Sequence, residues 1–253
     1  MNYKKEMEAT DMNIKQNKTL AFITARGGSK SIPLKNIVPV CGKPLIEYSI
    51  DALKKANTVD KIICSTDSEQ IANVCKQNDV KILQRPEHLG GDLVNSIDVV
   101  IDAAKTLNEV EGAVAEIILL IQPTSIFLTS TQIDKAVSAL LNNPKAKSSQ
   151  TVVKVPHQFH AHNQRIMTND SKDIYFAFLE ERNKGYSKQT KPEYYTYGNL
   201  IITRTLPLLK ENTLFARPSI PIEIPYYYSY DLDTQEDIEM AELMITNNLV
   251  ELG

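Results

Sequence analysis

The architecture of the chain is set by the segment Leu20-Ala-Phe-Ile-Thr-Ala-Arg-Gly-Gly-Ser-Lys-Ser-Ile-Pro-Leu-Lys-Asn36. Residues 20–25 form a largely apolar run, which is typical of a strand buried on both faces. The run ends at Arg26 in a loop with two adjacent glycines, whose backbone N–H groups can point at an anion without a Cβ in the way. With Lys30 and Lys35 nearby, this loop predicts a phosphate site. A basic surface turn is the alternative, and the spacing of a Walker loop is absent.

Outward from this segment, short apolar runs alternate with amphipathic runs. Strands are predicted at 61–65, 80–83 and 116–121, and helices at 45–53, 71–75, 97–104 and 131–141. This alternation predicts an α/β fold with a mostly parallel, doubly wound sheet and helices on both faces. Ligands of such sheets bind beyond the carboxyl ends of the strands. The loops expected at that edge are 26–36, 66–68, 85–96 and 122–129.

Composition narrows the classes of function. The net charge is -3 and no basic block occurs, which argues against a nucleic-acid partner. Residues 1–18 lack the apolar core of a signal peptide, and no later run approaches the ~18 apolar residues of a membrane span. We therefore expect a cytoplasmic protein without a membrane partner. Its three widely spaced cysteines suit buried, reduced thiols.

The string from Ala25 to Asn36 closely resembles the opening motif of the acylneuraminate cytidylyltransferases. These enzymes activate sialic acid and related nine-carbon keto-sugar acids as CMP-sugars. Further motifs extend the resemblance over roughly residues 19–247. It implies a single Rossmann-like nucleotidyltransferase domain over 19–253, preceded by an N-terminal extension, 1–18, that need not be ordered. The nucleotide-binding residues it implies in this loop are Ala25, Arg26, Gly27, Gly28, Ser29, Lys35 and Asn36.

The second loop carries two more of the nine glycines, Gly90 and Gly91. The family pattern Arg-Pro-x-x-Leu-x-x-Asp-x-x-x-Ser is matched here from Arg85 to Ser96. The resemblance implies that Arg85, Ser96 and the backbone near Val94 frame the cytosine together with Asn36. A salt bridge from Arg85 to Glu87 or Asp92 is the alternative.

The third loop begins with Gln122-Pro-Thr-Ser125. Its uncharged hydrogen-bonding groups suit a polyol, so Gln122, Thr124 and Ser125 are candidates for binding the sugar. A helix entry capped by Thr129 or Ser130 is the structural alternative. The family continues with Pro-Leu-Arg, whereas this chain has Ile, Phe and Leu at 126–128, so any role of that Arg is lost or supplied elsewhere.

Residues 155–198 interrupt the alternation. In the family this region is a dimerisation arm that reaches the partner's sugar site, which implies a homodimer. Aromatic residues are dense here, although core packing explains them equally well: Tyr175, Phe176, Phe178, Tyr186, Tyr194, Tyr195 and Tyr197. A metal site at His157, His160 and His162 is a weaker alternative, because no further ligand cluster completes it.

The clearest departure from the family follows this region. The family has Asn-Gly-Ala-Ile-Tyr where this chain has Tyr197-Gly-Asn-Leu-Ile201, and Gly198 is the position retained as a substrate-binding candidate. Because the resemblance places this motif at the acyl sugar, the departure leaves the identity of the sugar open. The candidates for its carboxylate are Arg165, Arg182, Lys191 and Arg204.

The last motif is Asp231-Leu-Asp233, which closely resembles the family's Asp-Ile-Asp. In an extended chain the two carboxylates lie on one face, where they can bind Mg²⁺ together with phosphate oxygens. Alternatively, Asp233 or Thr234 caps a helix that runs to Met244.

These residues predict an Mg²⁺-dependent cytidylyltransferase with CTP and a keto-sugar acid as substrates. The catalytic residues would be Arg26 and Lys35 on the triphosphate and Asp231 and Asp233 on Mg²⁺. A nucleotidyltransferase for another sugar or base, and a non-catalytic nucleotide-binding subunit, are the alternatives.

Overall fold

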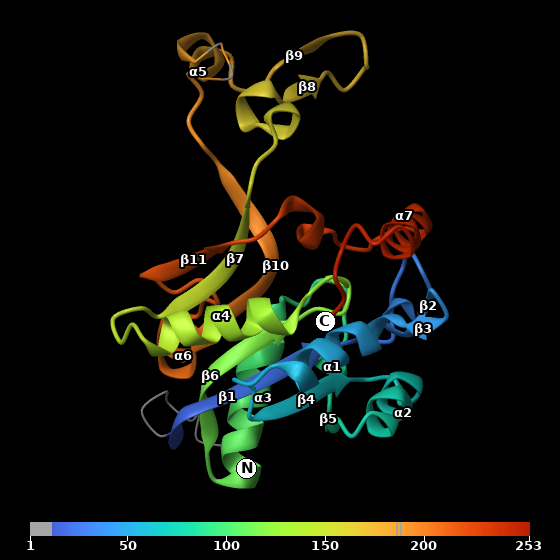
Figure 1. Cartoon of the computed structure of the whole chain (residues 1–253), viewed down its shortest axis with the longest axis vertical. Coiled ribbons are helices and arrows are strands. Elements are labelled where there is room, and N and C mark those ends of the chain that lie inside the picture. The colour runs from blue at the N-terminus through green and yellow to red at the C-terminus, as the bar shows by residue number, and fades with distance from the viewer. Residues whose placement is uncertain (1–11, 186, 188) are drawn as a thin grey trace, which may run out of the picture.

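A seven-stranded sheet crosses the body of the protein in a computed structural model that describes residues 12–185, 187 and 189–253 (Figure 1). Within these residues the strand order is β11-β7-β10-β6-β1-β4-β5. The strands are β1 (Ile14–Thr24), β4 (Lys61–Thr66), β5 (Lys81–Gln84), β6 (Val114–Ile121), β7 (Ser148–Lys154), β10 (Tyr195–Arg204) and β11 (Ser219–Glu223).

Most neighbouring strands run in parallel, as the sequence predicts. β1 pairs in parallel with β4 and β6, β4 with β5, and β11 with β7. Only β10 is inverted within this sheet, since it lies antiparallel between β6 and β7. β1 begins at Ile14, which pairs with Val114, so the sheet reaches into the predicted N-terminal extension. Residues 1–11 of that extension lie outside the described residues.

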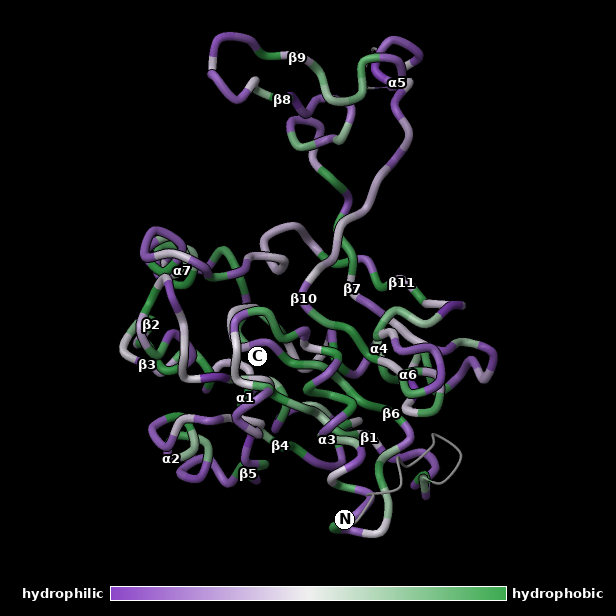
Figure 2. Tube along the Cα trace, turned by 180° about the vertical axis from the view of Figure 1, so that it is seen from behind, coloured by the Kyte–Doolittle hydropathy of each residue, from purple (hydrophilic) through white to green (hydrophobic). Residues whose placement is uncertain are grey.

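Helices cover both faces of the sheet, which confirms the doubly wound prediction. The alternation along β1 explains why: Ala21 and Ile23 enter one core, and Leu20 and Phe22 enter the other. Figure 2 shows hydrophobic residues following the central strands. On the first face lie α1 (Leu45–Lys55), α2 (Glu69–Gln77) and α4 (Ser130–Leu141), and on the second lie α3 (Ser96–Glu111) and α6 (Thr205–Glu211).

A third apolar cluster forms where α7 (Gln235–Thr246) meets the hairpin of β2 (Pro39–Val40) and β3 (Lys43–Pro44). Phe127 lies in this cluster together with Ile126, and Leu128 lies in the first core. All three are at most 1% exposed. The three side chains at 126–128, where the chain departs from the family motif, are therefore packed in the protein interior.

The expected helix caps are present. Thr129 and Thr234 each form a capping box at the start of α4 and α7, so the helix-cap interpretation of both loops is confirmed. The three cysteines are free, but Cys41 is exposed. The prediction that it is buried was wrong because Cys41 occupies the β2–β3 turn, where its φ of 48° and that of Gly42, 77°, reverse the chain.

Between β7 and β10, residues 155–194 project from the body (Figure 1), and we call this segment the arm. It contains 3-10 turns at His157–Phe159 and Ala161–Asn163, the antiparallel pair β8 (Arg165–Met167) and β9 (Ile174–Phe176), and α5 (Leu179–Lys184). Tyr186 lies outside the described residues.

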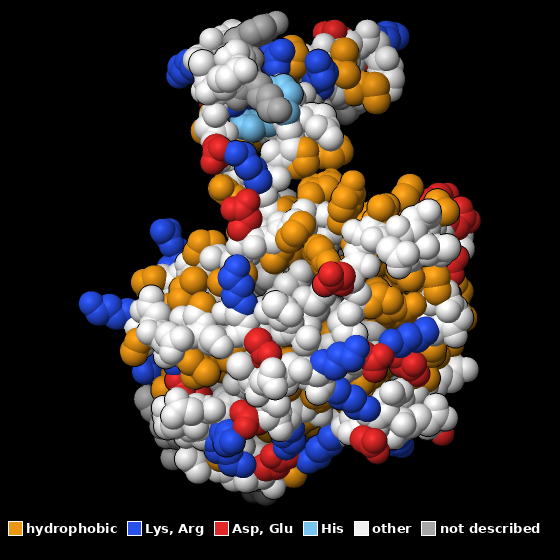
Figure 3. Space-filling model, viewed as in Figure 1, with side chains coloured by type: hydrophobic (Ala, Val, Ile, Leu, Met, Phe, Trp, Pro, Cys, Tyr) orange, Lys and Arg blue, Asp and Glu red, His pale blue; other side chains and the backbone are white. Residues whose placement is uncertain are grey.

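Hydrophobic side chains are exposed on the arm and on the body near its stem (Figure 3). On the arm they include Met167, Ile174 and Leu179, each more than half exposed. His160 and His162 instead pack on each other and on Tyr194, with ring centroids 4.7 to 5.7 Å apart. No group of three or more His, Cys, Asp or Glu side chains within the described residues is placed to hold a metal ion. Nor does any helix in that part of the chain have the length and apolar character needed to span a bilayer.

Candidate active site

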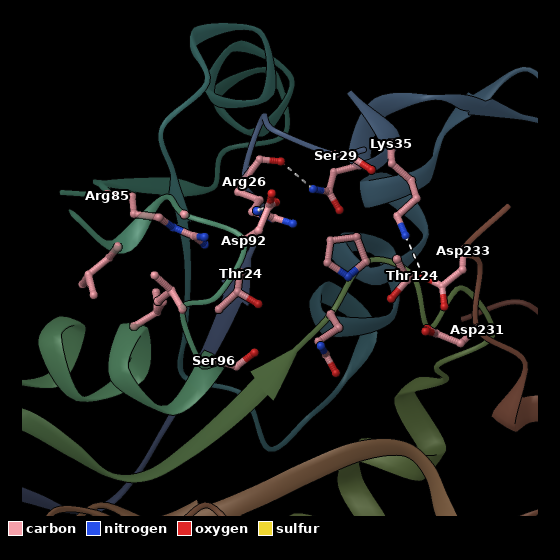
Figure 4. A pocket seen from close by; sticks show the side chains of 17 residues that line it. Thr24, Arg26, Ser29, Lys35, Arg85, Asp92, Ser96, Thr124, Asp231 and Asp233 are labelled. Atoms are coloured by element: carbon pink, nitrogen blue, oxygen red, sulfur yellow. Dashed lines mark hydrogen bonds and ion pairs between the residues drawn. The ribbon is translucent and has the colours of Figure 1, made fainter. Parts of the chain in front are cut away.

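A polar cleft of about 280 Å³ opens beyond the carboxyl ends of β1 and β6 (Figure 4). The chain steps outward from β1 through β4 and β5 and then returns to β6 on the other side of β1. This reversal separates the loops that follow β1 and β6, which makes the crevice between them a favourable place for a ligand. Eleven predicted site residues line the cleft: Arg26, Ser29, Lys35, Asn36, Arg85, Val94, Ser96, Gln122, Thr124, Asp231 and Asp233.

Five predicted residues do not line it, and the first three belong to the glycine loop. Ala25 is fully buried. The Gly27 N–H donates to Asp67 Oδ1 at 2.7 Å, and a Cβ on Gly27 would lie 2.8 Å from the Cβ of Ser68. Gly28 has open space where a Cβ would stand. Gly27 therefore allows the loop to approach the start of α2.

The other two, Ser125 and Gly198, support the site from behind. The Ser125 hydroxyl donates to Asp231 Oδ1 at 3.3 Å. Gly198 is buried in β10, where a Cβ would stand 2.6 Å from Thr151 Oγ1. In this structure Ser125 orients an acidic side chain, and Gly198 permits close packing of β10 on β7.

The cations of the first loop converge on Asp92. Arg26 Nη1 lies 2.5 Å and Lys30 Nζ 2.7 Å from its carboxylate oxygens. Hydrogen bonds from Lys30 and Arg26 lower the pKa of Asp92. The loop is held in place by Asn36, whose side-chain amide donates to the Arg26 carbonyl at 2.9 Å. A half-buried guanidinium and an exposed ammonium thus share one carboxylate of the cleft lining.

Lys35 joins the first loop to the last motif. Its ammonium lies 2.9 Å from Asp233 Oδ1, although the two residues are 198 positions apart. The neighbouring Asp231 has a raised pKa, chiefly because burial desolvates its carboxylate, with the charge of Asp233 adding to the effect. Hydrogen bonds from Thr124 and Ser125 and the charge of Lys35 oppose this shift. Backbone pairing of Leu232 N with Thr124 O at 3.1 Å fixes the acidic segment against the 122–125 loop.

Arg85 is buried at the back of the cleft, and burial lowers its pKa. Neither of the predicted alternative partners, Glu87 and Asp92, forms a salt bridge with it among the described residues. Its guanidinium donates instead to the Ser65 carbonyl at 2.9 Å and to the Ser65 hydroxyl at 3.2 Å. This arrangement fixes a cation at the end of β4.

Gly91, in the second glycine loop singled out from the sequence, lines the cleft. Sequence reasoning missed two contributors: Thr24 also lines the cleft, and Asp67 holds the first glycine loop. Thr24 and Asp67 come at or just after the ends of β1 and β4, so their positions at strand ends were the available signal. Asp92 was matched to the family pattern, but its pairing with two cations had no signature in the sequence.

The candidates for a sugar carboxylate lie away from the cleft. Arg204 forms a half-buried ion pair with Glu116 and donates to the carbonyls of Ala146 and Leu140. Arg165, Arg182 and Lys191 all belong to the arm. The first two stack on Phe176, and Lys191 donates to Asn163.

A family model described as Cytidylyltransferase matches residues 20–251 of the chain. The N-acylneuraminate cytidylyltransferase of Escherichia coli is 30% identical over 226 residues, which are 89% of this chain and 52% of that protein. The pseudaminic acid cytidylyltransferase of Campylobacter jejuni is 28% identical over 91% of this chain and 97% of its own length. The CMP-N,N'-diacetyllegionaminic acid synthase of Legionella pneumophila is 29% identical over 90% of this chain and 97% of its own length. The chain thus spans about half of the first relative and nearly all of the other two.

Solved structures show the same fold at lower identity. A CMP:2-keto-3-deoxy-manno-octonic acid synthetase complexed with CTP superposes with a TM-score of 0.66 at 15% identity, over 91% of this chain and 99% of that one. A 4-diphosphocytidyl-2C-methyl-D-erythritol synthase from Anaerococcus prevotii superposes with a TM-score of 0.61 at 18% identity, over 91% and 97% of the two chains.

Proposed function

The chain belongs to the cytidylyltransferase family, and on that premise we propose that it transfers CMP from CTP to a nine-carbon keto-sugar acid of the sialic acid type. The anomeric hydroxyl oxygen of the sugar attacks the α-phosphorus of CTP. The bond from that phosphorus to the oxygen bridging to the β-phosphate breaks, and the hydroxyl proton passes to solvent. The products are the CMP-sugar and pyrophosphate.

One observation carries this proposal: the contact between Lys35 and Asp233 in a cleft at the reversal point of the sheet. Nucleotidyl transfer needs cations for the triphosphate and carboxylates for a metal ion side by side. Lys35 and Asp233 come from opposite ends of the chain, and the fold brings them to 2.9 Å.

Arg26, Lys30 and Lys35 are the groups we assign to the triphosphate. Arg26 and Lys30 form ion pairs with Asp92 in this structure, and a bound triphosphate would replace Asp92 as the partner of both cations. Charge-assisted contacts of a guanidinium with phosphate oxygens are roughly twice as strong as neutral hydrogen bonds. Positioning and charge neutralisation, without a protein nucleophile, are then sufficient for the reaction.

The cytosine would bind deeper in the cleft, between Asn36, Arg85, Val94 and Ser96. Arg85 is rigid there because Ser65 accepts two of its hydrogen bonds. Fixed donors and acceptors are what selection of one pyrimidine edge requires.

Asp231 and Asp233 fit Mg²⁺, and we propose them as its ligands. Mg²⁺ is usually bound by one or two carboxylates together with substrate phosphates and water. Asp231 is oriented by the hydroxyls of Thr124 and Ser125, which leaves its charge facing the cleft. A bound Mg²⁺ would supply neutralisation of phosphate charge and acidification of the attacking hydroxyl.

Gln122 and Thr124 are our candidates for binding the sugar hydroxyls. In a homodimer, the arm of the other copy would supply the cation that binds the sugar carboxylate. The candidate cations Arg165, Arg182 and Lys191 lie on the arm, outside the chain's own cleft. Exposed apolar side chains on the arm support its use as a contact between two copies. We place the reaction in the cytoplasm, where CTP is made.

Pyrophosphate release from CTP with sialic, pseudaminic and legionaminic acids tests the proposal, with UTP, ATP and GTP as competing nucleotides. We expect turnover with CTP but not with the other three nucleotides, and loss of this turnover in Asp231→Asn. Asp79→Asn is the matched control, because Asp79 is exposed and its φ of 54° suits Asn. Absence of turnover with every sugar acid, in a protein that binds CTP, would favour the non-catalytic alternative.

A further inference from the structure

A second cavity, of about 420 Å³, opens beside the polar cleft. The two share Ser96 and Gln122, so they adjoin at these side chains. The second cavity, which we call the side cavity, is lined by Asn95, Ser96, Ile97, Leu120, Gln122, Tyr197, Ile201, Asn212, Thr213, Leu214 and Phe215.

The side cavity differs from the cleft in chemistry. The lining of the cleft includes both acidic and basic side chains, whereas no charged side chain lines the side cavity among the described residues. Its walls come from the end of β6, from β10 and from the loop after α6, and Leu120, Ile201 and Leu214 are buried there. Phe215 stands at its edge, 49% exposed. A substrate that spans both spaces would meet a charged end and an uncharged end, whose walls combine apolar side chains with amides and hydroxyls such as Asn95, Asn212 and Thr213.

Tyr197 is one of the polar side chains in the wall of the side cavity. It is half-buried, and its pKa is raised by burial and by the nearby charge of Asp231. Its hydroxyl has no hydrogen-bond partner within the described residues. Tyr197 therefore places an unused donor in the side cavity, near enough to Asp231 for the charge of that carboxylate to act on it.

Two of the positions where the chain departs from the family motif line this same cavity. They are Tyr197, at the motif's Asn, and Ile201, at its Tyr. Gly198 between them is held by packing on Thr151 and does not line the cavity. In the wall of this cavity, the phenol of Tyr197 thus replaces the amide of the family motif, and the alkyl group of Ile201 replaces its phenol.

We propose that the side cavity binds the apolar substituents of the sugar acid and selects acids with two acylamino groups and a terminal methyl over acids with a hydroxylated side chain. The inference rests on the proposed function, because the sugar must lie beside the triphosphate. Burial of methyl groups favours binding, and a hydroxyl buried against Leu120, Ile201 and Leu214 without a partner costs about 1 to 3 kcal/mol, roughly fivefold to 150-fold in affinity. Tyr197 would donate to an acyl oxygen.

Two sugar acids form a matched pair for the test. N,N'-diacetyllegionaminic acid differs from N-acetylneuraminic acid by an acylamino group in place of one hydroxyl and a methyl in place of the terminal hydroxymethyl. At saturating CTP we expect kcat/KM to be at least about 30-fold higher for the diacylated acid. The reason is that N-acetylneuraminic acid would bury two hydroxyls without partners, at about 1 kcal/mol or more each. Equal or greater use of N-acetylneuraminic acid overturns the inference and leaves the proposed function standing. No turnover with these two acids or with pseudaminic acid refutes both.

Variants locate the selection. Phe215→Ser and Tyr197→Phe should each raise KM for the diacylated acid about fivefold to tenfold and leave KM for CTP unchanged. The matched control is Leu243→Ser, since Leu243 is a similarly exposed apolar residue on α7, away from the cavity. If both cavity variants keep the wild-type preference while circular dichroism shows them folded, the cavity is not the selecting site.

Discussion

Lys35→Met separates the catalytic interpretation of the Lys35–Asp233 contact from a structural one. The side chain of Lys35 is only 13% exposed, whereas that of Asp233 is 75% exposed. An ion pair with one partner so exposed contributes at most about 1 kcal/mol to stability. We therefore expect the melting temperature to fall by no more than about 4 °C in a chain of this size.

The effect on the rate should be far larger. If Lys35 neutralises charge that develops on the phosphates, its loss lowers kcat by about 10²- to 10³-fold, as for other single electrostatic stabilisers. Lys35 also lowers the pKa of Asp231, so its removal raises that pKa further. Because the proposed metal ligand must be ionised, the acid limb of the pH–rate profile should move to higher pH.

The assay is pyrophosphate release at saturating CTP and sugar acid, measured across the pH range in which the protein stays folded. Lys35→Arg keeps the charge and should recover part of the rate. Lys18→Met is the control, because Lys18 forms an ion pair with Asp60 at 2.6 Å and does not line the cleft. A kcat within about threefold of wild type, or an acid limb that does not move upward, would refute the reasoning.

Three further outcomes are expected. Arg26→Ala should lower kcat by about 10²-fold with little change in the sugar KM, whereas Gln122→Ala should raise mainly the sugar KM. Steady-state kinetics would show the reverse pattern if the cleft binds the two substrates in the opposite orientation. Replacing 157–193 by a short Gly-Ser linker should give an inactive monomer by sedimentation, and an active monomer would exclude a shared site. Glu111→Gln should cost about 1 to 2 kcal/mol at pH 7, because Lys61 and Lys81 hold the pKa of Glu111 at about 2 while the exposure of both lysines screens the interaction. That stabilisation exists above the ordinary Glu pKa and is lost as pH falls toward 2, so the difference in urea unfolding should disappear at low pH.

The sequence by itself determined the layers of the fold and most of the cleft. Apolar runs such as Leu20–Ile23, with alternate residues entering opposite cores, require a sheet covered on both faces, because no other arrangement buries them. Polar residues at strand ends, such as Arg26 and Gln122, then fall at one edge of the sheet. Helix caps such as Thr129 and Thr234 could be predicted from the sequence because their contacts lie within one helical turn.

Only the tertiary structure decided which partners these residues take. Asp92 binds Arg26 and Lys30, and Lys35 meets Asp233 across 198 positions, because loops from different strands converge in space. The inverted course of β10 and the side cavity beside Tyr197 are equally invisible in local pattern. Hydrophobic periodicity is a local property of a chain, whereas the pairing of charges and the shape of a cavity depend on contacts between distant segments, which exist only once the chain is packed.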